Sequence, residues 1–192
     1  MLNRENMKKP ESMSDHDWEL LKDQTSSLTR IVEDARADTE AYLANPKGRS
    51  KGTGPDSTVP TGLPTLLLTV TGRKSGEQRT LPLVFMQSGE EMVVVGSLGG
   101  YDRHPAWYLN ISANPGCRLQ LDDQKMAAVA RDASAEERKE LWPRLIAMFP
   151  NWGFFQHQTD RPFPIVILTP RPSTTAVTRT FANSMISRWK SG

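Results

Sequence analysis

The chain has 192 residues, 24 of them basic and 22 acidic, so its net charge of +2 creates no overall field that would attract nucleic acid, and we predict no nucleic-acid partner. This length suits one domain with a full core, and the single cysteine, Cys117, excludes an internal disulfide framework and fits a reducing compartment. Neither a leader-like apolar segment nor 18 consecutive apolar residues occur, so we expect a soluble, cytoplasmic protein.

The first predicted element is one long helix over Ser14–Ala44. Ser14 is a suitable N-cap, and Asp15 and Asp17 favour the first turn. The helix should pack either on the body of the protein or on a second subunit in a homodimer, because one narrow face carries residues at steps of three and four. Thr25 and Thr39 fill the gaps between its apolar residues, which are Trp18, Leu21, Leu28, Val32, Ala35 and Tyr42. The stretch 45–64, rich in proline and glycine, predicts a linker.

From residue 65 onward, short apolar segments alternate with turn signals. Two helices interrupt them: Pro105–Ala113 starts with proline, and Ser134–Phe149 has Ser134 and Glu137 in capping-box spacing. Hairpin turns are expected at Ser88–Gly89 and Asp122–Asp123. The predicted strands are Thr65–Val70, Arg79–Met86, Glu91–Ser97, Cys117–Leu121, Lys125–Arg131 and Ile165–Leu168.

Strand–helix–strand repeats are absent from this order, which disfavours a parallel sheet. The sequence therefore predicts a mainly β protein with flanking helices (α+β), built as a small six-stranded antiparallel barrel. We divide the chain into a helical arm (1–44), a linker (45–64), a barrel domain (65–170) and a basic tail (171–192).

A cationic turn is the first candidate binding site. The segment Thr71–Gly76 (TGRKSG) lies between two predicted strands and is followed by Arg79. Arg73, Lys74 and Ser75, together with exposed backbone N–H groups of a glycine-bounded turn, favour an anion such as phosphate or carboxylate. A solvated hairpin could carry the same cations, and the hexapeptide alone leaves both interpretations open.

The second candidate is Ser97–Gly100 (SLGG), directly after an apolar strand. Gly99 and Gly100 allow a tight turn that brings backbone N–H groups close to a ligand. Trp107 and Asn110 follow at a spacing that places them on one helix face. Trp107 is either a core residue or a wall beside a flat ring.

Aromatic residues gather at Phe149, Trp152, Phe154 and Phe155, where they could line a cavity for a planar molecule or cap an end of the barrel. The three histidines have no metal-ligand spacing, and Cys117 lies in a strand-like segment that favours a core position. The catalytic residues are therefore undefined, and any redox chemistry would come from a cofactor.

In combination, these motifs resemble the deazaflavin-dependent nitroreductase family, which uses coenzyme F420. The resemblance rests on LLLTVTGRKSGEQRTLPL (Leu66–Leu83), VVVGSLGG (Val93–Gly100), HPAWYLNISANP (His104–Pro115), RDASAEERKELWPRL (Arg131–Leu145) and TDRPFPIVILTP (Thr159–Pro170). It implies a split β-barrel in which a reduced deazaflavin donates hydride to a small-molecule acceptor: a quinone, an enone or a nitro compound.

The resemblance also implies roles for individual residues. Arg73, Lys74 and Arg79 would hold the phosphate and acidic tail of the cofactor, Ser97 with the Gly99–Gly100 backbone would meet its linker and ring, and Trp107 and Asn110 would pack beside it. The implied acceptor pocket contains Val84, Phe149, Trp152 and Phe155.

The chain departs from the family pattern at five positions. Leu98 replaces a cation present in many relatives, and tyrosines of a nitroimidazole-reducing relative are replaced here by Val84 and by Phe149, Trp152 and Phe155. The pocket is then more apolar, which favours a quinone or hydrophobic enone over a nitroimidazole. Two alternatives stay open: an FMN-binding barrel oxidoreductase, and a non-catalytic cofactor-binding protein.

The C-terminal tail carries apolar residues at four-residue steps beside basic ones. Val177, Phe181, Met185 and Trp189 form the apolar face, flanked by Arg179, Arg188 and Lys190. Such a basic amphipathic helix either docks on the protein itself or makes peripheral contact with a membrane, in which case the protein would be membrane-associated.

Overall fold

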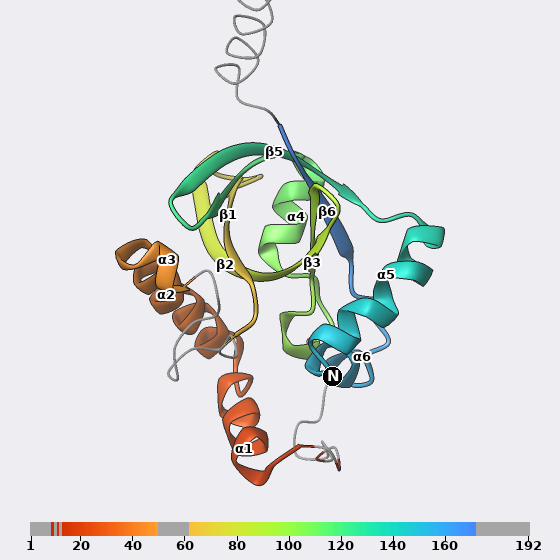
Figure 1. Cartoon of the computed structure of the whole chain (residues 1–192). Helices are drawn as coiled ribbons and strands as arrows, with labels where there is room; N and C mark the ends of the chain where they lie inside the picture. The colour runs from red at the N-terminus through yellow and green to blue at the C-terminus, as the bar shows by residue number, and fades with distance from the viewer. Residues whose placement is uncertain (1–8, 10, 12, 50–61, 172–192) are drawn as a thin grey trace, which may run out of the picture.

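The computed structural model describes residues 9, 11, 13–49 and 62–171 (Figure 1). The predicted amphipathic tail and most of the predicted linker lie outside these residues. Among the helices of the described part, none is both long enough and apolar enough to cross a membrane.

Six strands form a closed barrel in the order β1-β2-β3-β6-β5-β4, and every neighbouring pair is antiparallel. The predicted fold class is therefore confirmed. The strands are β1 (Thr65–Thr71), β2 (Gln78–Ser88), β3 (Glu91–Val95), β4 (Gly116–Leu121), β5 (Gln124–Asp132) and β6 (Ile165–Pro170).

The interior of the barrel is filled by a single apolar cluster. Alternate residues of each strand point inward, as Leu66, Leu68 and Val70 of β1 do. Helix α4 (Ala106–Ala113) contributes Trp107 and Ile111 to the same cluster, and Figure 1 shows this helix within the ring of strands. The barrel is thus a packed core without a central channel.

A second apolar cluster covers the outside of β2, β3 and β6. Val93 and Val95 point outward from β3 while Met92 and Val94 point inward, so this strand buries both of its faces. Because both faces of β3 are buried, its sequence is continuously apolar and does not alternate between apolar and polar residues. The outer cluster is completed by side chains from α1 (Asp15–Gln24), α5 (Ala135–Met148) and α6 (Asn151–Gln156).

The single long N-terminal helix predicted from the sequence is wrong. The structure has two helices, α1 and α2 (Leu28–Ala44), separated at residues 25–27. Ser27 has an extended backbone and its hydroxyl accepts the Arg30 N–H at 3.0 Å, so it begins a new helix. The predicted apolar stripe is interrupted as well, because Val32 is 65% exposed.

Two short helices were not predicted. Helix α3 (Pro46–Arg49) occupies the start of the expected linker, and α6 lies in the aromatic segment after α5. Pro150 and Gly153 conceal α6 in the sequence because both residues are poor helix formers away from the first turn. Strand β3 also ends at Val95, two residues before the predicted end at Ser97.

Helix α2 is attached to the barrel through Tyr42, which is fully buried. Its hydroxyl lies 3.2 Å from the Thr65 carbonyl oxygen and 3.4 Å from that of Gln120, and it accepts the Asp122 N–H at 3.2 Å. One side chain thereby joins α2 to β1, β4 and the β4–β5 turn. Burial raises the pKa of Tyr42, which keeps the hydroxyl protonated at neutral pH.

We expect Tyr42→Phe to lower the free energy of unfolding by about 1–2 kcal/mol, because the half-buried Asp122 N–H loses its acceptor while the ring packing is kept. Urea denaturation measures this value. Leu43→Ala is the matched control, since Leu43 is the next residue and is 52% exposed. Equal stability of the Tyr42→Phe variant and the parent would contradict the attachment role.

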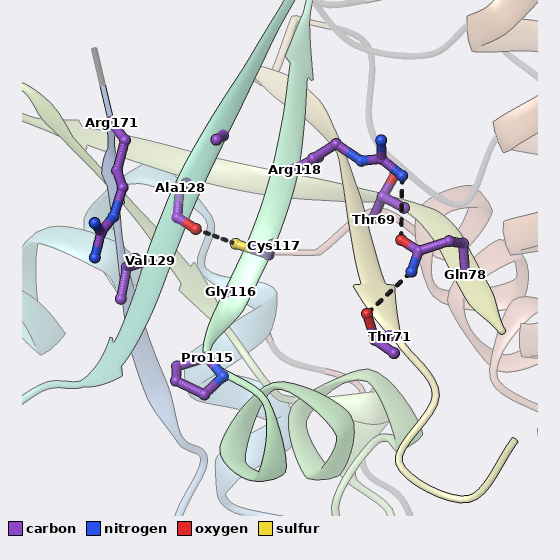
Figure 2. Close-up of a pocket in the computed structure, with 11 residues that line it drawn as sticks. Thr69, Thr71, Gln78, Pro115, Gly116, Cys117, Arg118, Ala128, Val129 and Arg171 are labelled. Carbon is purple, nitrogen blue, oxygen red and sulfur yellow. Dashed lines mark hydrogen bonds between the residues drawn. The ribbon is translucent and has the colours of Figure 1, made fainter. Parts of the chain in front are cut away.

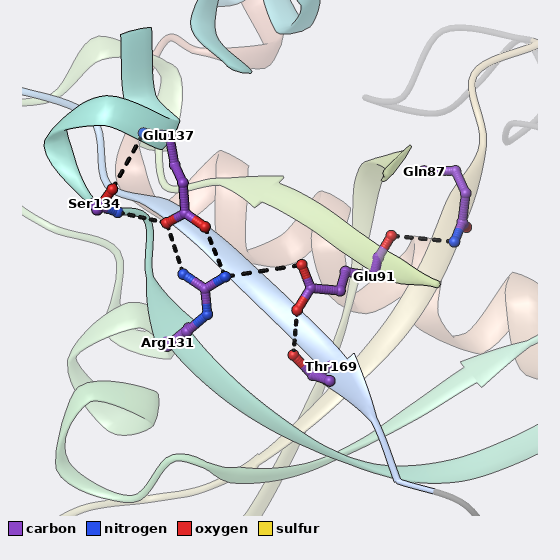
Figure 3. Close-up of polar contacts among 6 residues, drawn as sticks. All are labelled: Gln87, Glu91, Arg131, Ser134, Glu137 and Thr169. Carbon is purple, nitrogen blue, oxygen red and sulfur yellow. Dashed lines mark hydrogen bonds and ion pairs between the residues drawn. The ribbon is translucent and has the colours of Figure 1, made fainter. Parts of the chain in front are cut away.

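Helix α5 begins at a charged network on the barrel (Figure 3). Ser134 and Glu137 form the predicted capping box, with the Ser134 N–H donating to Glu137 Oε2 at 2.8 Å. The same carboxylate accepts two hydrogen bonds from Arg131 of β5, at 2.7 and 2.8 Å. The Arg131 guanidinium first, and then the Ser134 N–H, lower the pKa of Glu137 from 4.5 to about 2.

Because the pKa of Glu137 is lower in the folded state, its contribution to stability is complete above pH 4.5 and is lost as the pH falls towards 2. We expect Glu137→Gln to melt at a lower temperature than the parent at neutral pH, and the difference to shrink progressively below pH 4.5. Thermal melts across this range test the prediction, with Glu140→Gln on the same helix as control. A difference that does not change with pH would contradict it.

Candidate functional site

The predicted cationic turn is present between β1 and β2. The Gly72 N–H donates to the Glu77 carbonyl and the Gly76 N–H to the Gly72 carbonyl, both at 2.8 Å. Gly76 has φ 72°, a left-handed conformation that favours glycine. The turn therefore holds Arg73, Lys74 and Ser75 exposed at the rim of the barrel.

Asn110 of α4 supports this turn from below. Its side-chain oxygen accepts both the Arg73 N–H at 3.2 Å and the Arg73 guanidinium at 3.0 Å. Asn110 is only 7% exposed, so a buried side chain holds the exposed Arg73 in place. Within the described residues its side-chain NH2 group has no acceptor, which leaves a buried donor available beside Arg73.

The cations of the turn differ in their partners. Arg79 forms an ion pair with Glu77, so part of its charge is already neutralised. In the described part of the chain, neither Arg73 nor Lys74 has a carboxylate partner. The turn thus presents two uncompensated positive charges, whereas the sequence predicted three equivalent ones.

The second predicted site, the loop after β3, has an unusual backbone. A short 3₁₀ segment η2 (Leu98–Gly100) contains three consecutive residues with positive φ: Leu98 at 49°, Gly99 at 58° and Gly100 at 81°. Leu98 is a non-glycine residue in this region, and such backbone strain is typical of ligand-binding loops. The cofactor-binding role of Ser97, Gly99 and Gly100 stays a prediction.

Neighbouring elements leave no room for side chains at the two glycines. A Cβ atom on Gly100 would lie 3.0 Å from the Phe155 carbonyl oxygen of α6, and one on Gly99 would lie 3.1 Å from the Thr25 methyl group. The loop therefore lies between α6 and the junction of α1 with α2. This contact with the N-terminal helices could not be read from the sequence.

Arg161 is a structural residue of the site that the sequence reasoning missed. Its guanidinium donates to the carbonyl oxygens of Ser97 at 2.7 Å, Tyr101 at 2.9 Å and Gly96 at 3.1 Å. One side chain thus fixes both ends of the glycine loop. Its signal in the sequence is an arginine in the TDRPFP segment, directly after the aromatic residues.

His104 lies beside Arg161, with its Nδ1 atom 3.4 Å from the guanidinium group. Burial, and secondly the positive charge of Arg161, lower the pKa of His104 below its usual 6.5. The imidazole is therefore neutral at pH 7, which makes it a poor proton donor there.

The four residues predicted for the acceptor pocket lie together in the outer cluster. Val84, Trp152 and Phe155 are buried, and Phe149 packs against Trp152 with ring centroids 5.2 Å apart. Trp18 and Leu21 of α1 belong to the same cluster, and Trp18 meets Phe154 edge-on at 5.6 Å. Helix α1 thus contributes to the same apolar cluster as the aromatic residues that were predicted to contact an acceptor.

Trp107 and Cys117 both belong to the packed interior of the barrel. Trp107 is 7% exposed, so its packing supports the core interpretation over that of a wall beside a ring. Cys117 is confirmed as a core residue, and burial raises the pKa of its thiol to about 11. A thiol that stays protonated is a weak nucleophile.

Comparison with known proteins decides the family. The model of the F420H(2)-dependent quinone reductases matches residues 43–170, more than half of the chain. The chain belongs to this family. An F420H(2)-dependent quinone reductase of Mycobacterium tuberculosis is 32% identical over 116 residues, covering 59% of this chain and 78% of the relative. Another protein of that organism is 36% identical over 109 residues, 57% of this chain and 92% of the relative.

Solved structures agree with the family. An F420-H2-dependent reductase (FDR-A) superposes with a TM-score of 0.51 at 35% identity, covering 54% of this chain and 92% of the other. A chain described as a domain-swapped dimer gives 0.52 at 34% identity, covering 74% and 99%. The resemblance drawn from the motifs is thus confirmed: this member of the F420H(2)-dependent quinone reductases is an oxidoreductase whose cofactor is reduced F420.

The residues present fit this cofactor. F420 carries a phosphodiester and carboxylates, and the turn offers two uncompensated cations, with a buried amide donor beneath them. In the described residues, no group of three or more His, Cys, Asp or Glu side chains could hold a metal ion.

We expect Arg161→Gln to loosen the glycine loop without unfolding the barrel. Loss of a charged donor to three carbonyls should reduce the free energy of local opening by about 2 kcal/mol, which corresponds to roughly thirtyfold faster amide exchange. Hydrogen exchange of residues 96–104 measures the effect, with Arg144→Gln on α5 as control. Unchanged protection of residues 96–104 against amide exchange would contradict the role of Arg161 in fixing the loop.

Proposed function

We propose that this protein transfers hydride from reduced F420 to a quinone at the rim of the barrel. The observation that carries the proposal is the Arg73–Asn110 pair, which fixes a cation with no carboxylate partner in the described residues. When bound, reduced F420 supplies the hydride. The chain itself supplies binding, orientation and exclusion of water.

On the cofactor side, we assign Arg73 and Lys74 to the phosphate, with Ser75 and Arg79 at the edge of the same turn. Asn110 acts twice: its oxygen orients Arg73, and its free NH2 group can donate to the ligand. Helix α4 is about 12 Å long by its eight residues. It begins six residues after Gly100 and carries Asn110 beneath the turn, so we place the linker and ring beside it, at the loop of Ser97, Gly99 and Gly100.

On the acceptor side, we place the quinone at the surface that the glycine loop and α6 form together. Support comes from the close approach of Gly100 to the Phe155 backbone, which puts the loop against the aromatic cluster. The predicted lining residues Val84, Phe149, Trp152 and Phe155 carry no hydroxyl group, so the surface suits an apolar ring. Because His104 is neutral at pH 7, we assign the proton that follows the hydride to solvent.

The division into arm, linker, barrel and tail remains part of this proposal, as does a homodimer. The structural neighbour described as a domain-swapped dimer covers 74% of this chain and supports exchange of an element between subunits. The cytoplasmic location and the membrane contact through the tail also stay predictions.

We expect Arg73→Ala to weaken binding of oxidised F420 by about 10- to 100-fold, since a charge-assisted contact to phosphate is lost. Asn110→Ala should weaken binding by about tenfold, because Arg73 loses its anchor. Fluorescence titration with F420, and separately with FMN, measures both affinities.

Arg144→Ala on α5 is the control for removal of a surface charge. Melting temperatures show whether each variant is folded. Parent-like affinity in the Arg73→Ala and Lys74→Ala variants would refute the anion site, and binding of FMN in place of F420 would refute the cofactor assignment for this chain.

A further inference from the structure

The stripe predicted for a single N-terminal helix continues across the joint between α1 and α2, which is formed by residues 25–27. Its steps alternate strictly between three and four residues, the repeat of helices that pair along a seam. The stripe consists of Trp18, Leu21, Thr25, Leu28, Val32, Ala35, Thr39 and Tyr42. These residues share one face only in an uninterrupted helix, whereas the structure breaks the helix within the stripe.

The folded chain buries the ends of this stripe and leaves its middle exposed. Trp18 and Leu21 are 8% and 6% exposed in the outer cluster, and Tyr42 is fully buried against the barrel. Val32, which lies between them, is 65% exposed. The repeat therefore carries apolar surface that the broken helix leaves in solvent.

The joint itself can become helical. Residues 15–44 contain neither glycine nor proline, so no residue in this range prevents a continuous helix. The break is stabilised by Ser27, whose backbone is extended and whose hydroxyl accepts the Arg30 N–H. A straight joint loses this cap, but it pairs the N–H groups at the start of α2 with carbonyl oxygens of α1. The two conformations thus differ by a few local interactions.

Apolar side chains place α1 on the barrel. Trp18 meets Phe154 edge-on at 5.6 Å, and Leu21 belongs to the outer cluster together with Trp152 and Phe155. A second copy of the chain carries the same cluster, so α1 can make these contacts on either barrel. Because identical contacts contribute equally to both arrangements, the joint and any new contact between the copies decide which arrangement forms.

We propose that two copies of this chain exchange α1 in a domain-swapped homodimer. The joint straightens in both copies, and α1 of each copy packs on the outer cluster of the other. One helix over residues 15–44 is about 45 Å long, which carries α1 off its own barrel while Tyr42 keeps α2 attached. Val32 lies five residues after the joint, where the two straight helices pass each other, and the second copy covers it there.

The exchange builds the acceptor surface from two chains, with Trp18 and Leu21 supplied by the other copy. This consequence rests on the proposed function, which places the quinone at the aromatic cluster. The exchange itself does not involve F420, so it is tested through the oligomeric state.

Size-exclusion chromatography with light scattering measures the mass of the full chain over a wide range of concentration. We expect the parent to form a dimer. Ser27→Ala should lower the dissociation constant of this dimer roughly 30-fold, because each of the two joints loses the cap that stabilises the break.

Leu28→Pro should have the opposite effect and be monomeric. Proline is favoured at the first position of α2 and keeps the preceding residue extended, as Ser27 is, but it cannot lie inside a straight helix. Leu28→Ala removes the same side chain and should stay dimeric. Val32→Lys should weaken the dimer, yet leave the melting temperature unchanged in the monomeric Leu28→Pro background, where residue 32 is exposed.

The outer face of the barrel over β1, β4 and β5 offers a rival contact between copies. A groove of about 630 Å³ crosses these strands, with Arg118 and Arg171 at its sides (Figure 2). Ala127→Arg adds a large charged side chain to this groove and should leave the dimer intact. A dimer that is lost in Ala127→Arg but kept in Leu28→Pro would place the contact at the groove and overturn the exchange.

A dimer that persists in Leu28→Pro under any condition would contradict the exchange, because it does not need a straight joint. A parent and a Ser27→Ala variant that both stay monomeric would overturn it as well. Either result leaves the cofactor site of the proposed function intact, and failure of the parent to bind F420 would refute that function without affecting the exchange.

Discussion

Closure of the six-stranded barrel is the constraint on which the other features depend. Because β4 pairs with β1, the ring of strands has a fixed inside, which Trp107 and Ile111 of α4 help to fill. The outer faces of β2, β3 and β6 then carry a second apolar surface that α1, α5 and α6 must cover. The position of α4 inside the ring also brings Asn110 against the turn after β1, so the packing of the core also fixes the position of Arg73.

Arginine side chains organise the polar parts of this framework. Arg161 holds a strained loop through three carbonyl oxygens, whereas Arg131 ties α5 to β5 through a bidentate contact with Glu137. Both use the planar, multiply donating guanidinium group, which lysine does not provide. Arg73, Arg118 and Arg171 are instead exposed, and among the described residues no carboxylate pairs with any of them.

The N-terminal helices link the architecture to the chemistry of the family. Trp18 and Leu21 of α1 pack in the cluster that contains Trp152 and Phe155, and Thr25 touches the backbone position of Gly99. Reduction by F420 needs an acceptor close to the ring and away from bulk water. Helix α1 packs in this aromatic cluster, and the following helix, α2, is attached to the barrel through Tyr42.

The sequence alone determined the elements whose signals are local. Strand and turn patterns predicted six antiparallel strands, Ser134 and Glu137 predicted the start of α5, and the motifs around Arg73 and Gly99 predicted the family. Only the tertiary structure decided the break at Ser27, helix α6, the pairing of Arg73 with Asn110 and the clamp of Arg161. The last two pairings join residues 37 and 64 positions apart. Local patterns cannot encode such contacts, since they exist only after the barrel has closed and packed.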